Sequence, residues 1–527
     1  METPDDLFKR LEQLNDIGAS LSNERNLDRL LEKILMAAKA ITRADGGTLY
    51  LVSDDRQRLH FQIVRTDSLN IAFGGTSGQP VSGKFPDLAL YKPDGQPNNT
   101  MVAVDAAIGG KTINIADAYT VLGFDFSGTR KFDERTGYRS QSFLTVPMQN
   151  HEGEIIGVLQ LINAQDSSGQ VGAFNTADQR LAESLASQAA IALTNRQLVE
   201  QLEELFESFI KMINLAIDEK SPYTGGHCQR VPELTMMPAE AVNATTEGPL
   251  ADFQLTDKDR YELRIASLMH DCGKVTTPVH VVDKATKLQT IYDRIHIVDT
   301  RFEVIKRDAA VQLWQKIAQG ESRIDAENEF SVFCQQCDTD RDFLRKSNIG
   351  GERMRDEDIE RIKQIGQQYR WRNVQGEDAP FLTENELENL TIRAGTLTGP
   401  ERETINHHIV ATIKMLEQLP WPKHLKNVPE YAGGHHERMD GKGYPKGLKR
   451  EEMSWQARMM GISDIFEALT AKDRPYKDGM KLSQALGILE NFKNNGHIDP
   501  DLHAIFLKSG VYRDYAAHFL GAQQIDC

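Results

Sequence analysis

The residues best suited to chemistry lie between positions 431 and 447, in the stretch YAGGHHERMDGKGYPKG. Two adjacent histidines, His435 and His436, are followed directly by Glu437, and Asp440 comes three positions later. Imidazole and carboxylate groups on a rigid loop can form a metal pocket. A solvated loop that happens to carry histidines is the alternative for so short a motif. Four residues that shape the turn complete the motif: Gly441, Gly443, Tyr444 and Pro445.

Two earlier segments carry further candidate ligands. SPYTGGHCQRV places His227 just after a Pro/Gly turn, and the apolar segment YELRIASLMHDCGKV carries His270, Asp271 and Lys274. Adjacent residues cannot share a helix face, so one metal ion can engage both His270 and Asp271 only near a helix end. Gly273, directly afterwards, predicts that the helix ends there. A capped helix end with a hydrogen-bonded histidine is the alternative for this pair alone.

Helical periodicity selects between two further histidines, His407 and His408. The apolar stripe of the helix ERETINHHIVATIKML contains four residues: Ile405, Ile409, Thr412 and Leu416. At ~100° per residue, His408 lies about 60° from the centre of this stripe and His407 about 160° from it, so we expect His408 to face inward. Asp464 lies on another apolar helix, where a carboxylate is costly unless it is paired or binds a metal.

The candidate metal ligands are therefore His227, His270, Asp271, His408, His435, His436 and Asp464. Five imidazoles and two carboxylates exceed the needs of one tetrahedral zinc ion and suit two ions such as iron or manganese, with one carboxylate bridging them. Two such cations can activate a shared water and stabilise a displacement at phosphorus. The candidate partners for the phosphate oxygens are Lys274, Arg474 and Lys477. The predicted reaction is phosphate ester hydrolysis, with Asp271 and Lys274 as catalytic residues.

The composition is typical of a globular protein with several domains. The 527 residues are 40% hydrophobic and 26% charged, with a net charge of -16, which disfavours binding to nucleic acid polymers and anionic lipid. No apolar run is long enough to span a bilayer, and the acidic N-terminal segment is unlike a signal peptide. Five cysteines do not make a disulfide framework in a chain of this length. We expect a cytoplasmic protein without a membrane segment.

The first 200 residues contain only two of the 14 histidines and are expected to hold no metal. Apolar residues recur at helical spacing between positions 8 and 40, and strand-like segments follow at 46–52 and 59–64. The segments RKFDERTGYRSQSFLTVPM and EIIGVLQLINA are expected to form strands joined at the turn 151–153, and a long helix is expected to begin near Thr176.

This order of elements over about residues 10–195 resembles a GAF domain, which implies an antiparallel sheet with flanking helices. The most specific segment is similar to the NKFDE signature of cyclic-nucleotide-binding GAF domains, with Arg130 in place of the Asn. The matching residues, a candidate ligand site, are Lys131, Phe132, Asp133 and Glu134. The resemblance implies a cyclic nucleotide as candidate ligand. Another small ligand and a purely dimerising scaffold are the alternatives.

The helix that begins near Thr176 is expected to continue as a connector. Its apolar residues alternate at spacings of four and three: Leu198, Leu202, Leu205, Phe209, Met212 and Ala216. This spacing predicts the seam of a parallel two-stranded coil in a homodimer. A helix buried against its own domain is the alternative.

The segments HDCGK (270–274) and HHERMDGKGYP (435–445) are together similar to the paired signature of HD-GYP phosphodiesterases. The resemblance covers about residues 205–290 and 395–510. It implies a helical bundle that hydrolyses cyclic di-GMP or a related cyclic dinucleotide to linear dinucleotide or GMP, with metal and phosphate roles for the residues named above. It also implies contacts between the motif loop and diguanylate cyclase domains. Members with a third metal have a Glu where this chain has Tyr223, so we expect two.

The predicted fold is α+β: a GAF sensor domain over 1–175, a connecting helix over 176–222, and an all-α HD-GYP domain over 223–527. A helical insertion over about 285–393 interrupts the last domain and contains a lone CxxC, a weak zinc signal. A ligand-regulated phosphodiesterase is the preferred function. The alternatives are a non-catalytic docking protein and a hydrolase that acts on hybrid cyclic GMP-AMP or another nucleotide.

Overall fold

The computed structural model describes residues 4–24, 26–166, 168–221, 226–351, 353–472 and 479–527. The chain divides into two compact units, Met1–Phe206 and Glu207–Cys527, which are described separately. The division falls within helix α5 (Thr176–Lys220), which begins at the predicted residue. None of the described helices is both long and apolar enough to cross a bilayer.

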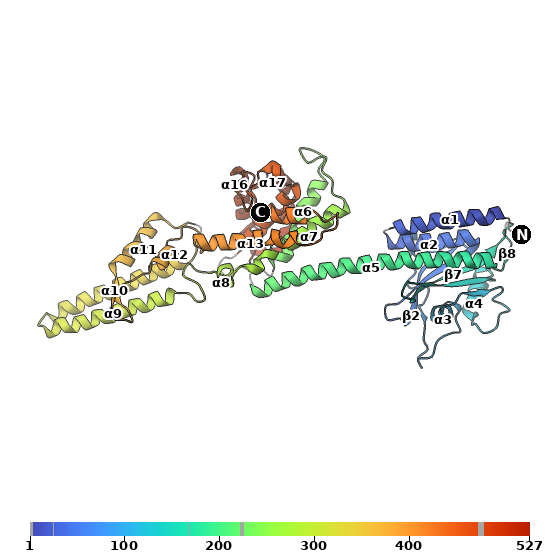
Figure 1. Ribbon diagram of the computed structural model, residues 1–527. Coiled ribbons are helices and arrows are strands. Elements are labelled where there is room, and N and C mark those ends of the chain that lie inside the picture. The colour runs from blue at the N-terminus through green and yellow to red at the C-terminus, as the bar shows by residue number, and fades with distance from the viewer. Residues whose placement is uncertain (1–3, 25, 167, 222–225, 352, 473–478) are drawn as a thin grey trace. The chain divides into compact units, whose positions relative to one another are not determined.

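The first unit is built on an antiparallel sheet with the strand order β3-β2-β1-β7-β6-β5, in which β4 pairs with β2 and β8 with β7 (Figure 1). The strands are β1 (Ala44–Val52), β2 (Arg58–Thr66), β3 (Ile71–Phe73), β4 (Leu88–Ala89), β5 (Ile113–Ile115), β6 (Phe143–Gln149), β7 (Ile155–Gln165) and β8 (Val171–Gly172). The helices before α5 are α1 (Pro4–Asn23), α2 (Leu27–Thr42), α3 (Val102–Gly109) and α4 (Ser127–Thr136). The predicted α+β class with an antiparallel sheet is confirmed.

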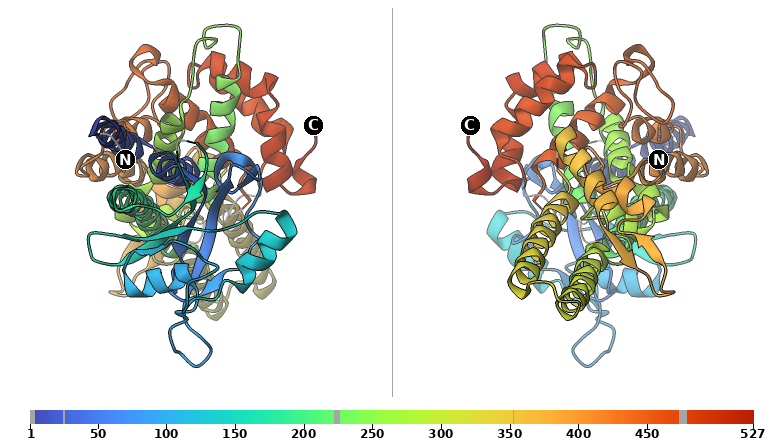
Figure 2. Two further views of the ribbon diagram at one scale, coloured as in Figure 1. Left: turned by 90° about the vertical axis from the view of Figure 1, so that its right-hand side faces the viewer. Right: turned by 90° about the vertical axis from the view of Figure 1, so that its left-hand side faces the viewer.

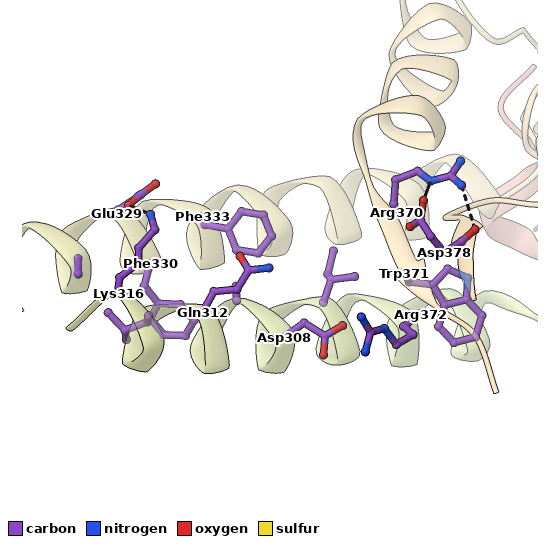
Figure 3. Close-up of a pocket in the computed structure, with 14 residues that line it drawn as sticks. Asp308, Gln312, Lys316, Glu329, Phe330, Phe333, Arg370, Trp371, Arg372 and Asp378 are labelled. Carbon is purple, nitrogen blue, oxygen red and sulfur yellow. Dashed lines mark hydrogen bonds and ion pairs between the residues drawn. The ribbon is translucent and has the colours of Figure 1, made fainter. Parts of the chain in front are cut away.

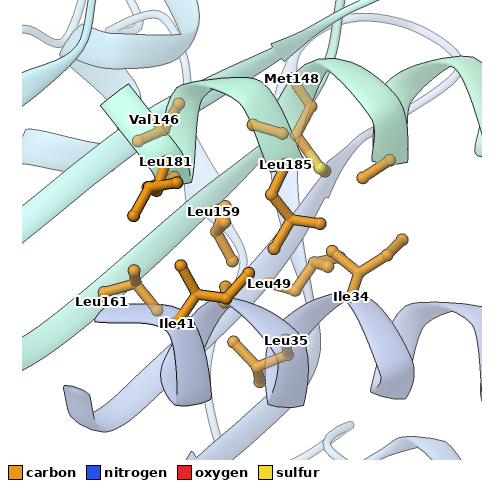
Figure 4. Packing of buried hydrophobic residues seen from close by; sticks show 14 of the residues in the cluster. Ile34, Leu35, Ile41, Leu49, Val146, Met148, Leu159, Leu161, Leu181 and Leu185 are labelled. Carbon is orange, nitrogen blue, oxygen red and sulfur yellow. The ribbon is translucent and has the colours of Figure 1, made fainter. Parts of the chain in front are cut away.

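Helices α1, α2 and α5 cover one face of this sheet (Figure 1). The apolar residues of α2 recur at helical spacing, so Ile34 and Leu35 reach the sheet together and contact Leu49 and Leu159 in a dry core (Figure 4). Burying each such side chain contributes about 1.5–3 kcal/mol. Helices α3 and α4 lie on the opposite face.

The strand predicted for RKFDERTGYRSQSFLTVPM is correct only in its second half. Strand β6 covers FLTVPMQ, whereas KFDERT belongs to α4. Lys131 and Glu134 are exposed while Asp133 is buried, and Gly137 ends the helix with a left-handed backbone (φ 70°). Asp133 is the one buried residue of α4, so the sequence of this segment shows no apolar stripe at helical spacing.

The second unit is helical around the histidine-rich segments. Its main helices are α6 (His227–Asn243), α7 (Asp257–Met269), α13 (Gly399–Glu417), α14 (Val428–Gly433), α15 (Trp455–Thr470), α16 (Leu482–Asn494), α17 (Pro500–Lys508) and α18 (Val511–Phe519). Helix α6 packs against α7 and α15, and a short 3₁₀ helix, η2 (Cys272–Thr276), packs against α13. Capping boxes at Thr256 and Thr398 fix the starts of α7 and α13.

Residues 285–393 form an insertion lobe with a hydrophobic core of its own, which includes Val298, Phe302 and Leu344. The lobe contains α9 (Ile295–Ala318), α10 (Arg323–Asn348), α11 (Asp356–Gln368), α12 (Glu384–Leu390) and a hairpin of β9 (Arg370–Arg372) and β10 (Asp378–Pro380). Helices α9 and α10 lie side by side (Figures 1 and 2). The helical character is as predicted, and the hairpin is an addition. Cys337 of the CxxC pair is buried in the lobe core, and neither cysteine belongs to a metal-binding group among the described residues.

The predicted coiled-coil seam lies on an exposed face of α5. Its five large residues are 50–65% exposed: Leu198, Leu202, Leu205, Phe209 and Met212. Asn214 and Ile217, on another face, are buried, and the Asn214 side-chain amide donates to the Leu268 carbonyl. The alternative of a seam buried against its own domain is therefore wrong for these five residues.

Candidate metal centre

Chain reversals, rather than helix interiors, position the first three candidate ligands. His227 is the first residue of α6, and α7 ends at Met269, so His270 and Asp271 occupy the junction between α7 and η2. The predicted helix end is confirmed, but the role of Gly273 differs from the prediction. A Cβ on Gly273 would lie 2.0 Å from the His408 carbonyl oxygen, so glycine is needed for the close approach of η2 to α13.

The remaining ligands come from α13, the segment after α14, and α15. His408 is buried on α13 and His407 is exposed, which confirms the orientation predicted from periodicity. His435 and His436 follow α14 directly, and Asp464 lies on α15. The structure thus brings together all seven candidate ligands from five segments of the chain, six of them buried and His436 partly exposed.

Three of the other candidate ligands surround His227. Its Nε2 lies 3.1 Å from Asp271 Oδ2, 3.2 Å from Asp464 Oδ1 and 3.2 Å from His270 Nε2. His270 Nε2 is also 3.2 Å from Asp271 Oδ2. The ligand atoms of His227, His270 and Asp271 form a compact group of the kind that holds a divalent ion, and Asp464 lies beside it.

A second group adjoins the first through Asp271. His408 Nε2 lies 3.3 Å from Asp271 Oδ1 and 3.2 Å from His436 Nε2, and His435 completes this group. The two oxygens of Asp271 therefore face different histidine groups. Asp271 is thus placed so that each of its oxygens could serve a separate group of ligands.

Hydrogen bonds to the other ring nitrogen fix which atom of each imidazole faces the pocket. The Nδ1 atoms of His270, His408 and His435 lie 2.7, 2.6 and 2.6 Å from the carbonyl oxygens of the residues three positions earlier. A carbonyl only accepts, so each Nδ1 carries the proton and each Nε2 presents a lone pair. His227 Nδ1 is likewise 2.5 Å from a Glu467 carboxylate oxygen.

The resulting cluster has too many acceptors for its own donors. His227 Nε2 and His270 Nε2 face each other beside two carboxylate oxygens, so a positive charge is needed among them, either a proton on His227 or a bound cation. His435 Nε2 and Asp271 Oδ1 are buried and have no hydrogen-bond partner within the described part of the chain. These unsatisfied acceptors fit two divalent metal ions.

Glu467 is a functional residue that the sequence reasoning missed. Its side chain is fully buried, and it accepts from both His227 Nδ1 and the Arg230 guanidinium, at 2.5 and 2.7 Å. Glu467 follows Asp464 by three positions on an apolar helix, so both carboxylates lie on the same face of α15. That spacing was the signal that could have found it.

The electrostatics of the cluster follow from its burial and its carboxylates. Burial lowers the pKa of His435 well below its usual range and that of His436 to about 4, so both imidazoles are neutral at pH 7. Burial also disfavours the charged form of His227, but Glu467 and the two aspartates outweigh it and raise the pKa of His227 well above 6.5. The same negative surroundings that hold this proton also favour a metal cation.

Of the three predicted phosphate partners, Lys274 is the one that lies among the described residues. Its ammonium lies 2.5 Å from Asp271 Oδ2 and its side chain is partly buried. Burial lowers the pKa of Lys274, but Asp271 outweighs this and raises it above 10.5, so the positive charge is retained. Arg474 and Lys477, like Tyr223, lie outside the described residues.

The motif loop shapes the site without adding ligands. Glu437 accepts from the backbone amides of Lys446 and Leu448, which closes the loop. Asp440 pairs with the Arg438 guanidinium at 2.8 Å, and neither Glu437 nor Asp440 joins a metal-binding group among the described residues. A Cβ on Gly443 would meet the backbone of residues 437–438 at 2.4 Å, and Gly441 has a φ of 75°. The ring of Tyr444 stacks on His436, with centroids 4.9 Å apart.

The GAF signature forms a closed polar cluster instead. Asp133 is buried and accepts from the backbone amide and hydroxyl of Ser140 and from the hydroxyl of Tyr119, at 2.7–2.8 Å. Lys131 and Glu134 are exposed. A cavity of about 640 Å³ in this unit is lined by residues of β2 and of 74–87, and none of the signature residues contributes to it.

Comparison with known protein families agrees with the two units. Residues 26–193 match a family model described as a GAF domain, and residues 360–502 match one described as an HD domain. This chain joins a GAF domain to an HD domain. The HD match begins within the insertion lobe and leaves out His227, His270 and Asp271, which the fold nevertheless places beside the matched ligands of the HD domain.

Individual relatives match a limited part of the chain. It is 37% identical over 121 residues to a cyclic di-GMP phosphodiesterase of Pseudomonas aeruginosa, covering 23% of this chain and 28% of that protein. It is 35% identical over 117 residues to a 3'3'-cGAMP-specific phosphodiesterase of Vibrio cholerae, covering 22% and 24%. A solved GAF domain from a Coxiella burnetii phosphoenolpyruvate-protein phosphotransferase is 16% identical, covering 37% of this chain and 98% of that one, with a TM-score of 0.28. The chain thus spans about a quarter of the length of these two curated relatives.

Proposed function

We propose that the HD domain is a metal-dependent phosphodiesterase that hydrolyses cyclic di-GMP, or a related cyclic dinucleotide, to linear dinucleotide or GMP. The observation that carries this proposal is the pair of buried histidine groups that share Asp271. A donor set of imidazoles and carboxylates suits iron or manganese. The names of the bacterial relatives, which include cyclic di-GMP and 3'3'-cGAMP phosphodiesterases, support the substrate class.

The residues of the chain supply binding, orientation and charge. The proposed metal ligands are His227, His270, Asp271, His408, His435, His436 and Asp464. When bound, a pair of such ions would supply a nucleophile from water at neutral pH and would stabilise charge on the phosphoryl oxygens. Glu467 orients His227 and raises its basicity, and the backbone carbonyls orient three other rings.

Lys274 is proposed to bind a non-bridging phosphate oxygen. Its retained positive charge and its place beside Asp271 suit that role. Arg474 and Lys477 are proposed as further phosphate partners because the family resemblance implies such a role for them. Tyr444 holds the ring of His436 by stacking, and burial of the cluster limits the access of bulk water.

A substrate panel tests this function. Protein loaded with iron or manganese would be incubated with cyclic di-GMP, with 3'3'-cGAMP and with a simple phosphodiester, and the products separated by chromatography. Turnover of cyclic di-GMP supports the proposal. The name of the Vibrio cholerae relative favours 3'3'-cGAMP as a second candidate substrate, which preferential turnover would establish. No turnover of any substrate would contradict the hydrolase and leave the motif loop, 441–445, as a docking surface for diguanylate cyclase domains.

The GAF domain and the connector are proposed to regulate this activity in a cytoplasmic homodimer. The assigned boundaries are 1–175 for the sensor, 176–222 for the connector and 223–527 for the HD-GYP-like domain. The exposed apolar seam of α5 supports a parallel two-stranded coil with a second copy of the chain. A cyclic nucleotide or another small molecule is the proposed GAF ligand. A monomer in sedimentation experiments at micromolar concentration would contradict the coil.

A further inference from the structure

The insertion lobe contains a cavity whose chemistry differs from the rest of this acidic chain. The cavity has a volume of about 480 Å³ and lies between the end of α10, the start of α11 and the segment that follows α12. Ligand pockets in proteins are commonly about 300–1,000 Å³. None of its lining residues belongs to the metal centre.

The lining is strongly basic. Six cationic side chains line the cavity: Lys287, Lys346, Arg353, Arg355, Arg361 and Arg393. Asp358 is the sole carboxylate among the lining residues that the structure describes. Such an excess of positive charge is notable in a chain with a net charge of -16, because it concentrates anions at one place.

Three of the six cations have partners inside the lobe. Arg355 pairs with Asp358 at 3.0 Å, Arg361 with Asp340 at 3.2 Å, and Arg393 with Asp356 at 2.6 Å. Lys346 and Arg353 have no ion-pair partner within 4.0 Å in the described ranges of the chain, and both are exposed at the cavity rim. An added anion would therefore break no ion pair that the described residues form with Lys346 or Arg353.

Lys287 adds a buried positive charge to the lining of the basic cavity. Its ammonium donates to the carbonyls of Leu390 and Ile392, at 3.1 and 2.8 Å, and lies 3.7 Å from Met354 Sδ. These contacts satisfy its protons but do not neutralise its charge, and burial lowers the pKa of Lys287 to about 8, so it stays mainly protonated at pH 7. A buried cation without a carboxylate is costly, and a bound anion would offset that cost.

A second cavity in the same lobe provides a contrast. It has a volume of about 520 Å³ and lies beside the β9–β10 hairpin (Figure 3). Its ion pairs, Arg370 with Asp378 and Lys316 with Glu329, lie within the lining itself (Figure 3). Its lining is therefore largely self-neutralised, whereas in the basic cavity Lys287, Lys346 and Arg353 have no carboxylate partner within 4.0 Å among the described residues.

We propose that the basic cavity binds a small phosphate ester of the size of a nucleoside monophosphate. The phosphate would contact Lys346 and Arg353, and the buried ammonium of Lys287 would contribute further positive charge. The organic part would lie against Phe343 and Met354, which line the same cavity. Arg361 stacks over the Phe343 ring at 4.0 Å and extends this wall with a flat guanidinium that suits a planar base. This site is independent of the function proposed for the metal centre.

Calorimetric titration of the full chain with GMP, guanosine and inorganic phosphate tests the site. We expect GMP to bind more tightly than either of the other two probes. The double variant Lys346→Glu, Arg353→Glu should weaken GMP binding by at least about tenfold, because it replaces two cations that contact the phosphate with two carboxylates that repel it. Arg307→Glu is the matched control, since Arg307 is exposed on α9 of the same lobe but does not line the cavity.

The outcomes separate this cavity from the metal centre, because none of the changed residues is a candidate ligand. Unchanged GMP affinity in the double variant would overturn the proposal, as would equal binding of guanosine or of inorganic phosphate. Binding of an acidic peptide or a polynucleotide in place of GMP would overturn it as well. If circular dichroism shows that the double variant is misfolded, Arg353→Gln provides the measurement, and it should still weaken GMP binding severalfold.

Discussion

The metal centre of the HD domain and the signature segment of the GAF domain both contain buried polar residues. They differ in whether the buried acceptor atoms receive hydrogen bonds. At the metal centre, His435 Nε2 and Asp271 Oδ1 accept no hydrogen bond among the described residues. In the GAF segment, Asp133 accepts three, from Ser140 and Tyr119. The first cluster has capacity for a ligand and the second has used its capacity internally.

The difference shows how a motif can be sorted into a binding role or a structural role. A buried acceptor without a donor costs free energy, so several such acceptors in one place indicate a site that a cation or an ordered water completes. A buried carboxylate with three donors fastens the chain and contributes stability. The predictions below test each side of this contrast.

The largest effect is expected from Asp271→Ala. Asp271 faces both histidine groups, so its loss removes the shared ligand of both proposed ions. We expect metal content to fall below the level of detection by mass spectrometry and hydrolysis of cyclic di-GMP to cease. Asp440→Ala is the control, because Asp440 pairs with Arg438 outside the cluster. This variant should bind metal as the wild type does. Normal metal content in Asp271→Ala would remove the main support for a shared carboxylate.

Lys274→Ala should keep the metal and lose rate. Loss of a single charged donor to a transition state costs about a hundredfold or more in kcat. Because Lys274 is not a metal ligand, metal content should stay at the wild-type value. Steady-state kinetics and metal analysis on the same preparation separate the two effects. A variant that loses its metal as well would show that the ion pair with Asp271 is structural.

Glu467→Gln should weaken metal binding without removing a ligand. The amide still accepts from His227 but no longer provides a negative charge, and a partner of this kind typically contributes about 10–100-fold to metal affinity. Competition with a chelator measures the affinity. Glu417→Gln, an exposed carboxylate near the end of α13, is the matched control and should bind metal as the wild type does. Equal affinities in the two variants would show that Glu467 is only a packing residue.

Metal affinity should depend on pH through one proton. Without metal, His227 is protonated at pH 7 because its pKa is raised, whereas His436, with a pKa of about 4, is already neutral. Metal binding must displace this proton from His227, so affinity should fall as the pH decreases below the raised pKa, by about tenfold per unit if this is the only proton displaced. Chelator competition at two pH values one unit apart measures this slope. A hundredfold change would mean that a second ligand is also protonated.

The sequence could indicate which candidate residues face the cluster because helical periodicity and chain reversals act locally. His408 was separated from His407 by its angle to one apolar stripe, and the fold agrees. Glu467 was missed because a glutamate on an amphipathic helix is ordinary until its buried partner, 240 positions earlier, is known. The segment before Gly137 was assigned to a strand because only one of its residues, Asp133, faces inward.

Features that depend on segments distant in sequence could not be predicted in the same way. The basic cavity joins Lys287, Lys346 and Arg393, three residues from separate stretches that look like ordinary solvated charges. Gly273 was expected to end a helix through its backbone freedom, but the close passage of α13 is what excludes a side chain there. Local patterns identify which residues are unusual, whereas packing decides what they contact.

The smallest effect on the metal centre, and the clearest test of the GAF side of the comparison, is expected from Asp133→Ala. Removal of this carboxylate leaves the buried Ser140 amide and hydroxyl without their acceptor, which should lower the free energy of unfolding of the GAF domain by about 2–4 kcal/mol. Glu134→Ala, one position away and exposed, should change it by no more than about 0.5 kcal/mol. Thermal unfolding followed by circular dichroism measures both.

Metal content and the hydrolysis rate of Asp133→Ala should equal those of the wild type at temperatures below the GAF transition, because the hydrogen-bond partners of Asp133, Ser140 and Tyr119, belong to the GAF domain. The Asp133 carboxylate already accepts three hydrogen bonds, so we expect it to affect ligand binding only by stabilising the GAF domain. Any change in ligand response should then accompany a loss of stability. If Asp133→Ala unfolds like the wild type yet loses its response to a cyclic nucleotide, then Asp133 contacts the ligand directly. Counting satisfied acceptors would in that case fail to separate structural from binding motifs, and the contrast between the two clusters would not hold.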